Sequence, residues 1–587
     1  MTKATTAKNP PKIKLKKVLI ANRGEVAVRI IRACASYGLQ SVAVYADSDA
    51  NALHVRLADE AYSLDGRTAL ETYLDIDKVI AAAKASGADA VHPGYGFLSE
   101  RADFARAVED AGLIWIGPTP ENMELLGDKV SARAVAQKVG APLVAGTPGP
   151  VETPAEALAF ADEFGLPIAI KAAFGGGGRG LKVVFNRDEV EQAFAQATSE
   201  AVSAFGRGEC YVEKFVERPR HVEAQILGDG KGRVVVVGTR DCSLQRRHQK
   251  VLEEAPAPFL TDEQFDRLTH AVRAIGEAVN YRSLGTLEFM LGADGELSFL
   301  EVNTRLQVEH PVTERTTGLD LVVEQFKLAE GGTLDHLPDV VPSNGHALEF
   351  RINAEDPGRG FFPMAGHLTR FDMPGGPFLR VDAGVTSNGS ISPEFDSMIA
   401  KVIVWGNDRA EAIARGRQAM RECVIEGVPS LVGFHRRILQ EPGFVADNAK
   451  DFTIHTNWIE TECTWLGDLV QPFPAGFTSS DVVRTWFEVD SHWVRLGFPA
   501  ALLNSMRPAG SVEPSEHVQG AIWASMSGIV ARWFCQPGDV VEEGTRIGTL
   551  EAMKMEVPIV ADRSGMFAYL VEEGAIVQEG QPIALIA

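Results

Sequence analysis

A lysine near the C-terminus is placed where it could carry a covalent group. Lys554 lies between two methionines in the segment 551–556, EAMKME, midway between two similar stretches, 527–544 and 564–580. Both stretches alternate apolar and polar residues around glycine turns, which predicts two similar sets of strands that pair into a flattened barrel with Lys554 at a hairpin tip. An ordinary surface lysine is the alternative. The flanking thioethers would contribute little to a core but could be recognised by an enzyme.

A run of four glycines could cover a polyphosphate. Gly175, Gly176, Gly177 and Gly178 follow an apolar strand in LPIAIKAAFGGGGRG. Backbone N–H groups in such a loop can approach phosphate oxygens closely because no Cβ stands in the way. Lys129 and Lys171 are candidates for contacts with the same oxygens. The P-loop pattern is absent, so a different kind of phosphate-covering loop is predicted. The alternative, a flexible linker, is disfavoured by the well-patterned strands on both sides.

Two glutamates in TLEFMLGADGELSFLEVN could share a metal ion. If Asp294-Gly295 forms a two-residue turn, Glu288 pairs with Glu301, and Asn303 points to the same face as Glu301. Facing carboxylates repel each other unless a cation lies between them. Mg²⁺ or Mn²⁺ carrying nucleotide phosphates would remove the conflict, since both ions prefer oxygen ligands. A solvent-facing pair screened by water is the alternative.

The elements that must position these residues are predicted from hydrophobic periodicity. Residues 14–127 repeat a strand–helix–strand pattern and predict a Rossmann-like open α/β sheet. The first glycine turn has one glycine where a dinucleotide fingerprint has three, so a dinucleotide site is not predicted. Residues 128–344 and 345–460 mix hairpins with helices and predict α+β folds. Residues 461–515 are predicted to be a linker that can include a small docking or oligomerisation strand pair, and 516–587 form the all-β tail.

Charge and cysteine content exclude several classes of protein. The formal net charge of −22 over 587 residues disfavours a protein that coats nucleic acid, because the surface would repel the polymer. The six cysteines form no C-x-x-C pair, which indicates neither a disulfide framework nor a zinc knuckle and fits a reducing cytoplasm. No stretch approaches the roughly 20 apolar residues that cross a bilayer, so a membrane is not expected as a partner.

Specific motifs connect these regions to known families. The tail resembles a biotinyl carrier domain, whose A-M-K-M signature is intact at 552–555; the related lipoyl domains share the barrel but usually lack the two methionines. Residues 14 to about 460 resemble the biotin carboxylase family, which has an ATP-grasp fold. The motifs that carry this second resemblance are HPGYGFLSE at 92–100, RDCSLQRRHQK at 240–250, EVNTRLQVEHP at 301–311 and RINAED at 351–356. The whole arrangement is similar to the fused alpha subunits of actinobacterial acyl-CoA carboxylases.

The resemblance implies an ATP-dependent ligase that carboxylates the biotin on Lys554 with bicarbonate. The family pattern assigns bicarbonate binding to Lys250, Arg305, Gln307 and the backbone of Val308. Glu309 is implied to be the base that activates bicarbonate after ATP phosphorylates it, and Arg305 is the family's designated active-site residue. The phosphate released with CO₂ can then take the ureido proton of biotin. Arg351 is implied to stabilise the negative charge that develops on the biotin oxygen.

Further contacts are carried over from the same family. The implied ATP contacts are Lys129, Lys171, the glycine loop, Glu213, Lys214, His221, Gln245, His248, Glu288 and Glu301. The implied ligands of Mg²⁺ or Mn²⁺ are Glu288, Glu301 and Asn303. No residue of the family's catalytic set is missing, which disfavours the alternative of a carrier scaffold without activity.

The resemblance also implies partners. A carboxyltransferase domain needs several hundred residues, and the assigned regions leave only 461–515 unassigned. A separate carboxyltransferase beta subunit is therefore expected to pass the carboxyl group to acetyl-CoA, propionyl-CoA or another acyl-CoA, and a biotin protein ligase to load Lys554. A homo-oligomer or hetero-oligomer is expected. Two alternatives stay open, a biotin carboxylase subunit of a pyruvate or other carboxylase and a tail that carries lipoate.

Overall fold

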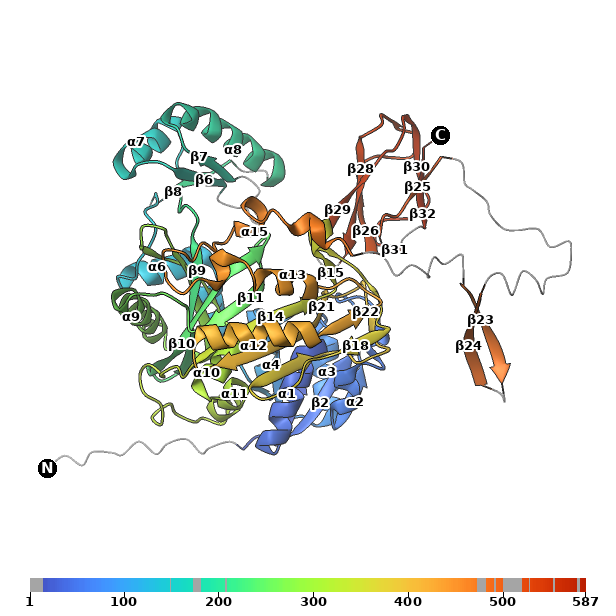
Figure 1. Ribbon diagram of the computed structural model, residues 1–587, viewed down its shortest axis with the longest axis horizontal. Coiled ribbons are helices and arrows are strands. Elements are labelled where there is room, and N and C mark those ends of the chain that lie inside the picture. The colour runs from blue at the N-terminus through green and yellow to red at the C-terminus, as the bar shows by residue number, and fades with distance from the viewer. Residues whose placement is uncertain are drawn as a thin grey trace, which may run out of the picture.

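The structure is a computed structural model with a large body and two protruding parts (Figure 1). The described residues are 14–147, 149–172, 181–205, 208–471, 482–489, 492–499, 520–526, 528–552, 555–577 and 581–586. The N-terminal tail before residue 14 lies outside them. Among the described residues, no helix combines the length and the apolar character needed to cross a lipid bilayer.

The N-terminal part is a five-stranded parallel sheet in the order β3-β2-β1-β4-β5. Its strands are β1 (Lys17–Ile20), β2 (Gln40–Tyr45), β3 (Glu60–Ser63), β4 (Ala90–His92) and β5 (Ile114–Trp115). The helices of this part are α1 (Gly24–Tyr37), α2 (Leu53–Leu57), α3 (Ile76–Ser86) and α4 (Ala102–Asp110), and α5 (Pro120–Gly127) and α6 (Lys129–Lys138) follow them. The central strands are apolar and buried, as expected of a parallel sheet covered on both faces. The predicted open α/β sheet is confirmed.

A small lobe is built around the strand that precedes the glycine run. It contains β6 (Ile168–Ala172), β7 (Leu181–Val184) and β8 (Cys210–Lys214) in the order β7-β6-β8, with α7 (Pro154–Phe164) and α8 (Val190–Phe205). Its own apolar core includes Phe160, Ile170 and Val212. The small lobe stands above the body, at the upper left of Figure 1.

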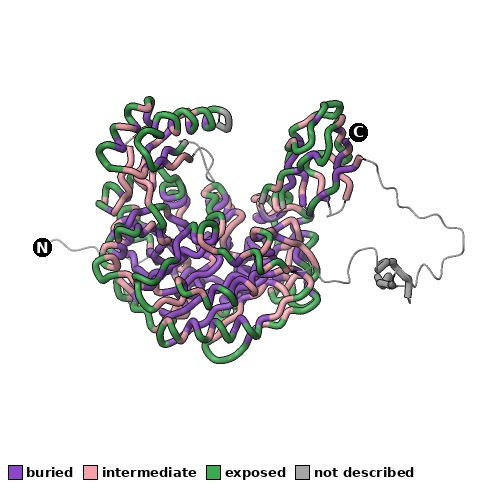
Figure 2. Tube along the Cα trace, turned by 45° about the horizontal axis from the view of Figure 1, so that its top comes forward, coloured by how far each residue is buried: buried purple, intermediate pink, exposed green. Residues whose placement is uncertain are grey.

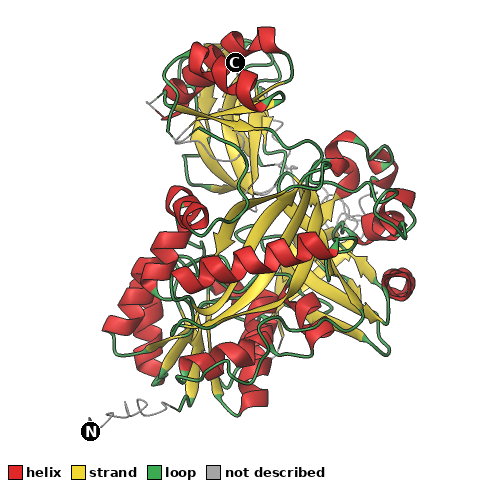
Figure 3. Cartoon of the chain, turned by 90° about the vertical axis from the view of Figure 1, so that its left-hand side faces the viewer, coloured by secondary structure: helices red, strands yellow, loops and turns green. Residues whose placement is uncertain are grey.

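The body is dominated by an eight-stranded antiparallel sheet, the central sheet, in the order β13-β12-β9-β10-β11-β14-β21-β19. Its strands are β9 (Arg220–Asp229), β10 (Val234–Arg246), β11 (Gln249–Ala255), β12 (Arg282–Leu291), β13 (Leu297–Asn303), β14 (His346–Asn353), β19 (Leu379–Ala383) and β21 (Met398–Gly406). The pairing of β11 with β14 makes the sheet continuous across residue 344, where two α+β regions were expected. The long strands of this sheet are visible in Figure 3.

Helices and short strand pairs surround the central sheet. The helices are α9 (Asp262–Ala278), α10 (His310–Thr317), α11 (Leu321–Ala329), α12 (Arg409–Glu422), α13 (Val432–Ile438), α14 (Pro442–Val445) and α15 (Trp458–Thr461). The short pairs are β15 (Glu355–Asp356) with β16 (Phe362–Pro363), β17 (Gly366–His367) with β20 (Ser390–Ile391), and β18 (Arg370–Asp372) with β22 (Val424–Glu426). The buried trace is concentrated in this body (Figure 2).

The strand pair predicted within 461–515 is present. β23 (Val482–Val489) and β24 (His492–Pro499) form an antiparallel hairpin whose register runs from Val482↔Pro499 to Val489↔His492. Its role in docking or oligomerisation stays a prediction, as do the domain boundaries on either side.

The C-terminal barrel, residues 520–586, has the predicted all-β structure. It consists of two four-stranded sheets, β25-β32-β30-β27 and β29-β28-β26-β31. The strands are β25 (Ala521–Trp523), β26 (Gly528–Trp533), β27 (Val540–Val541), β28 (Arg546–Ala552), β29 (Met555–Val560), β30 (Gly565–Tyr569), β31 (Ile576–Val577) and β32 (Pro582–Ile586). The two copies of the repeat exchange partners, since β26 pairs with β31 and β27 with β30. Each sheet thus contains strands of both copies.

The close approach of β9 to Tyr281, in the connection between α9 and β12, gives a testable prediction. A Cβ on Gly228 would lie 2.1 Å from the carbonyl oxygen of Tyr281, so Gly228→Ala forces the backbone of β9 to move. We expect the substitution to lower the free energy of unfolding by about 1–3 kcal/mol, the usual cost of overpacking. The unfolding midpoint in urea measures it. Gly127→Ala is the control, because a Cβ there meets no atom within 4 Å; equal midpoints for the two variants would contradict the prediction.

Candidate active site

The central sheet brings Glu288 and Glu301 together, as predicted, but the loop between their strands differs from the predicted one. The register pairs Glu288 with Glu301 across β12 and β13. However, β12 ends at Leu291 and pairs there with Leu297, so the expected two-residue turn at Asp294-Gly295 is wrong and the loop is longer. A β-bulge next to Glu288 shifts the register by one residue and restores the pairing. Glu288 is buried, with 5% of its surface exposed, whereas the Glu301 side chain is 33% exposed, so the pair reaches from the interior to the edge of the site.

A third carboxylate lies beside this pair, so that three carboxylates form a row across three adjacent strands. Glu223 of β9 lies directly opposite Glu288 on the other side of β12, and it is fully buried. Glu223 was not predicted from the sequence, because its strand, β9, is distant in sequence from the hairpin of β12 and β13. A signal was available in the alternation of β9, because Glu223 follows His221, a predicted ATP contact, by two residues and so lies on the same face of the strand. Like charges in adjacent strands require cations to hold them.

Two buried cations neutralise the row. The Lys250 Nζ lies 2.6 Å from Glu223, 3.0 Å from Glu288 and 2.6 Å from Glu309. Arg240 is completely buried, and its guanidinium donates to the other oxygen of Glu223. The remaining Arg240 donors bind Gln225, Thr286 and Thr313. Glu223, Glu288 and Glu309 thus each have a cationic partner, which is the condition under which buried ions are tolerated.

The ionisation states of Lys250 and Glu309 follow from this geometry. Burial by itself would lower the pKa of Lys250, but the thiol of Cys242 and the three carboxylates raise it well above its ordinary value. Burial by itself would raise the pKa of Glu309, but Lys250, Arg351 and Arg240 outweigh burial and the repulsion of Glu223, so its pKa is lowered. Both groups are therefore charged at neutral pH, and Glu309 is ready to accept a proton.

Arg351 links Glu309 to Glu253, a second carboxylate that was not predicted from the sequence. Its Nη2 donates to Glu309 at 2.9 Å and its Nε donates to Glu253 at 2.5 Å. Burial raises the pKa of Glu253 to about 7, although the charge of Arg351 opposes the rise. Glu253 reaches Arg351 because β11 and β14 pair side by side, a long-range contact that no local pattern in the sequence indicates.

The residues predicted to hold a divalent cation lie on the adjacent strands β12 and β13, where Glu288 pairs with Glu301 in register. Asn303 donates its amide N–H to Glu288 at 2.9 Å and accepts from Arg305 at 2.8 Å. The Lys129 Nζ lies 3.2 Å from the Glu301 carboxylate. Carboxylate and amide oxygens on one face of β12 and β13 are the ligand set that Mg²⁺ and Mn²⁺ prefer, so Glu288, Glu301 and Asn303 fit such an ion.

Four further predicted residues lie beside this centre. The His221 Nε2 is 3.2 Å from Glu288, and its Nδ1 is 2.9 Å from the Gln245 amide. Gln307 donates to Glu288 at 3.2 Å. The Val308 carbonyl oxygen accepts from the buried Lys401 Nζ at 2.8 Å. The structure therefore brings His221, Gln245, Gln307 and Val308 together with the catalytic set.

Other predicted residues lie apart from this centre. Lys171 and Glu213 form an ion pair of 2.6 Å in the small lobe. Lys214, on the next position of β8, donates instead to the Leu166 carbonyl at 2.9 Å. The glycines Gly175 to Gly178 lie outside the described residues, and so does Lys554, although β28 and β29 on either side of it pair as far as Ala552↔Met555.

The hairpin that carries Lys250 has an unusual turn. Arg246 pairs with Gln249, and the two residues between them, Arg247 and His248, have φ values of +49° and +64°. Non-glycine residues rarely adopt this left-handed conformation, and a two-residue turn of this kind favours Asn-Gly. Strain of this sort is concentrated at functional sites. His248, a predicted ATP contact, is therefore held at the tip of a strained turn.

A buried histidine supports the backbone of Arg351. The His435 Nε2 lies 2.7 Å from the Arg351 carbonyl oxygen, and the ring is completely buried against Phe350 and Phe434. Burial lowers the pKa of His435 to about 4, although the hydrogen bond opposes the shift. The ring is thus neutral in the folded protein at neutral pH.

This neutral ring predicts a specific acid sensitivity. Because the pKa of His435 is lower in the folded state than in the unfolded state, its contribution to stability is present above about pH 6.5 and is lost as pH falls toward 4. Between pH 7.5 and 5.5, His435→Gln should lose less stability than the parent chain, by about 1 kcal/mol. Urea midpoints at the two pH values measure the difference. The exposed His367→Gln is the control, and equal pH slopes for parent and His435→Gln would refute the prediction.

Models of known families match the chain in four consecutive segments. Residues 14–123 match "Biotin carboxylase, N-terminal domain", and residues 128–337 match "Carbamoyl-phosphate synthase L chain, ATP binding domain". Residues 349–461 match "Biotin carboxylase C-terminal domain", and residues 521–586 match "Biotin-requiring enzyme". We call Glu223, Arg240, Lys250, Glu288, Glu309 and Arg351 the buried charge cluster. The cluster lies in the second and third segments, and Lys554 lies in the fourth.

Individual relatives agree with these matches. The biotin-dependent acyl-coenzyme A carboxylase alpha3 subunit of Mycobacterium leprae is 49% identical over 595 residues, covering 98% of this chain and 99% of the relative. The biotin carboxylase of Nostoc sp. is 49% identical over 436 residues, covering 74% and 98%. The biotin carboxylase domain of the Hydrogenobacter thermophilus 2-oxoglutarate carboxylase, solved with MgADP and bicarbonate, is 42% identical with a TM-score of 0.71, covering 78% and 100%.

Proposed function

This chain belongs to the family of biotin-dependent acyl-CoA carboxylase alpha subunits, and from that premise we propose that it carboxylates the biotin on its own Lys554 at the buried charge cluster. The reaction is the ATP-dependent biotin carboxylation of this family, with bicarbonate as the carboxyl source. One observation carries the residue assignment. Lys250 and Arg351 both bind Glu309, so a base and two cations meet at one point in the sheet.

The cluster can activate bicarbonate with its own residues. Bicarbonate is a poor electrophile, and attack on ATP requires a base to increase its nucleophilicity while cations hold the two anions in line. Glu309 is ionised and can take the proton of bicarbonate. Lys250 and Arg351 then shift from Glu309 to the deprotonated bicarbonate. Arg305, whose Nη2 binds Asn303, lies at the edge of the same centre.

Three residue sets are proposed to hold the other components. Glu288, Glu301 and Asn303 would hold Mg²⁺ or Mn²⁺. Phosphate contacts are proposed for Lys129 and Lys171, each now paired with a glutamate that the incoming nucleotide can replace. When bound, the cation neutralises the phosphate charge, and biotin supplies the ureido nitrogen that accepts the carboxyl group.

A carboxyltransferase partner completes the proposal. The name of the M. leprae relative as an alpha subunit supports a separate beta subunit that transfers the carboxyl group to an acyl-CoA, and the H. thermophilus domain was solved as a dimer, which supports an oligomer. A biotin protein ligase is proposed to load Lys554. The six cysteines, all within the described residues, are unpaired. Unpaired thiols support the predicted cytoplasmic location.

The base can be tested directly. Glu309→Gln keeps the size of the side chain but cannot accept the proton, so bicarbonate-dependent ATP hydrolysis stimulated by free biotin should fall by about 10²–10⁴ in kcat. The exposed Glu422→Gln is the matched control. An unchanged kcat in Glu309→Gln would remove Glu309 from the mechanism, and no activity in the folded parent chain would overturn the enzymatic assignment.

The attachment site is tested separately. Lys554→Ala should abolish the streptavidin signal of protein produced together with a biotin protein ligase, and mass spectrometry should show the loss of one biotinyl group. The exposed Lys450→Ala should keep both signals. A parent chain that gives no streptavidin signal and instead has the mass of a lipoyl adduct would show that the tail carries lipoate.

A further inference from the structure

A further buried cation, Lys401, lies beside the catalytic cations of the central sheet. Lys401 of β21 stands directly opposite Arg351 of β14, and it is completely buried. Like charges opposite each other on neighbouring strands destabilise a sheet unless other groups compensate them. The groups around Lys401 therefore indicate why a lysine occupies this position.

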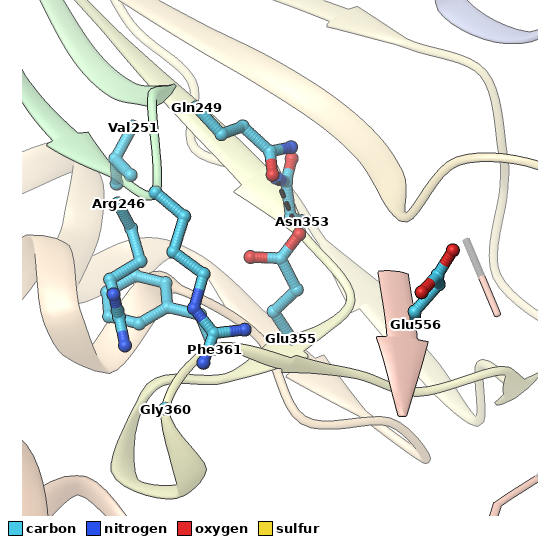
Figure 4. A pocket seen from close by; sticks show the side chains of 9 residues that line it. Arg246, Gln249, Val251, Asn353, Glu355, Gly360, Phe361 and Glu556 are labelled. Carbon is cyan, nitrogen blue, oxygen red and sulfur yellow. Dashed lines mark hydrogen bonds between the residues drawn. The ribbon is translucent and has the colours of Figure 1, made fainter. Parts of the chain in front are cut away.

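Lys401 is enclosed by protein groups. Two residues beyond Arg351 in β14, the chain reaches a cavity of about 310 Å³ beside the C-terminal barrel (Figure 4). Lys401 is not among the residues that line this cavity. Its Nζ lies instead 5.7 Å from the centre of the Tyr95 ring. The cavity lining includes Arg246, Arg247, Gln249, Asn353 and Glu355 of the body and Glu556 of the barrel.

Glu25 supplies the negative charge beside Lys401. Its carboxylate lies 3.2 Å from the Lys401 Nζ, and Glu25 is buried in the first turn of α1. Two other carboxyl groups near Lys401 are engaged or neutral. Asp382, which pairs with Lys401 across β19 and β21, is bound by Arg380 at 2.6 Å. Burial raises the pKa of Glu349 well above its ordinary value, although the charge of Lys401 opposes the rise, so this carboxyl is neutral.

Lys401 also holds a carbonyl group of the catalytic loop. Its Nζ donates to the Val308 carbonyl oxygen at 2.8 Å. The next residue, Glu309, is the N-cap of α10, and its own carbonyl accepts from the N–H of Val312, so the Val308 carbonyl lies outside the hydrogen bonds of the helix. Because a peptide unit is planar, the direction of this carbonyl sets the direction in which the chain enters Glu309.

We propose that Lys401 is a positioning residue for bicarbonate activation, because it orients the peptide unit between Val308 and Glu309. Lys401 acts through this peptide unit and does not touch the reacting atoms. Glu25 balances its charge and connects the unit to the first helix of the N-terminal part. The inference rests on the proposed function and deepens it, since the alignment of the base then depends on a lysine from β21.

Lys401→Met tests this role in the full chain. Bicarbonate-dependent ATP hydrolysis is measured with free biotin. We expect the KM for bicarbonate to rise at least about tenfold and kcat/KM for bicarbonate to fall about 10²-fold, because the base loses its alignment. The KM for MgATP should change less than about twofold, since the described contacts of Lys401 include no proposed ligand of phosphate or metal. A role in folding alone would lower the active fraction and leave both KM values unchanged.

The substitution does not leave an unpaired charge in the interior. Burial raises the pKa of Glu25 to about 7, and the charge of Lys401 opposes this rise. Without Lys401, the Glu25 carboxylate takes up a proton and becomes neutral, so the chain can keep its fold. Lys401→Met/Glu25→Gln removes both charges, a change that buried ion pairs often tolerate, and it should keep the bicarbonate defect of Lys401→Met. Urea midpoints verify that each variant is folded.

Glu25→Gln separates the carbonyl contact from the ion pair. It breaks the same ion pair but keeps the Lys401 donor for Val308, so kcat/KM for bicarbonate should stay within about threefold of the parent value. An unchanged KM for bicarbonate in Lys401→Met, an equal loss in Glu25→Gln, or parental kcat/KM in the double variant would each overturn the positioning role. No bicarbonate-dependent hydrolysis in the folded parent chain overturns the proposed function instead, because the parent keeps Lys401.

Discussion

The burial of one lysine among three carboxylates is the constraint on which the rest of the structure depends. Lys250 can stay charged inside the sheet because Glu223, Glu288 and Glu309 surround it at hydrogen-bonding distance. Those carboxylates can stay ionised only because Lys250 is joined by Arg240 and Arg351. Removing one partner of such a buried set typically costs about 3–5 kcal/mol, so the cluster must be assembled as a unit. The long antiparallel strands supply most of that assembly, because β9, β10, β11, β12 and β14 each carry one member in fixed register, and Glu309 joins them from the N-cap of α10.

Part of this arrangement could be predicted from the sequence. The pairing of Glu288 with Glu301 follows from a hairpin of two contiguous strands, and even an incorrect turn gave the right partner because a bulge compensated for it. Glu223 and Glu253 could not be placed in the same way. The contact of Glu223 with Glu288 depends on the pairing of β9 with β12, and these two residues are 65 positions apart. The contact of Glu253 with Arg351 depends on the pairing of β11 with β14, and these two residues are 98 positions apart. Neither the turn residues nor the hydrophobic periodicity of a segment indicates which distant strand it pairs with.

The fold class was easier to predict from the sequence than the contacts within the site. Repeated strand–helix patterns predicted the parallel N-terminal sheet, and the repeat around Lys554 predicted a flattened all-β barrel, in which the structure shows that the two copies exchange strands. The continuous central sheet was not foreseen, because periodicity identifies strands but does not say which of them pair. The roles of individual residues came instead from motif resemblance. The structure adds the reason why those residue types are needed, which is mutual neutralisation of charges that are largely buried.

A single hairpin connects the catalytic centre with the barrel. β10 and β11 carry Lys250 toward the carboxylates, while Arg246 and Arg247 at its end face the cavity beside the barrel. The turn between the strands keeps Arg247 and His248 in the left-handed region, which costs free energy at two consecutive residues. A relaxed turn would change the direction of the hairpin tip and with it the positions of these arginines relative to Lys250. The left-handed turn therefore relates the position of a catalytic cation to that of the hairpin tip.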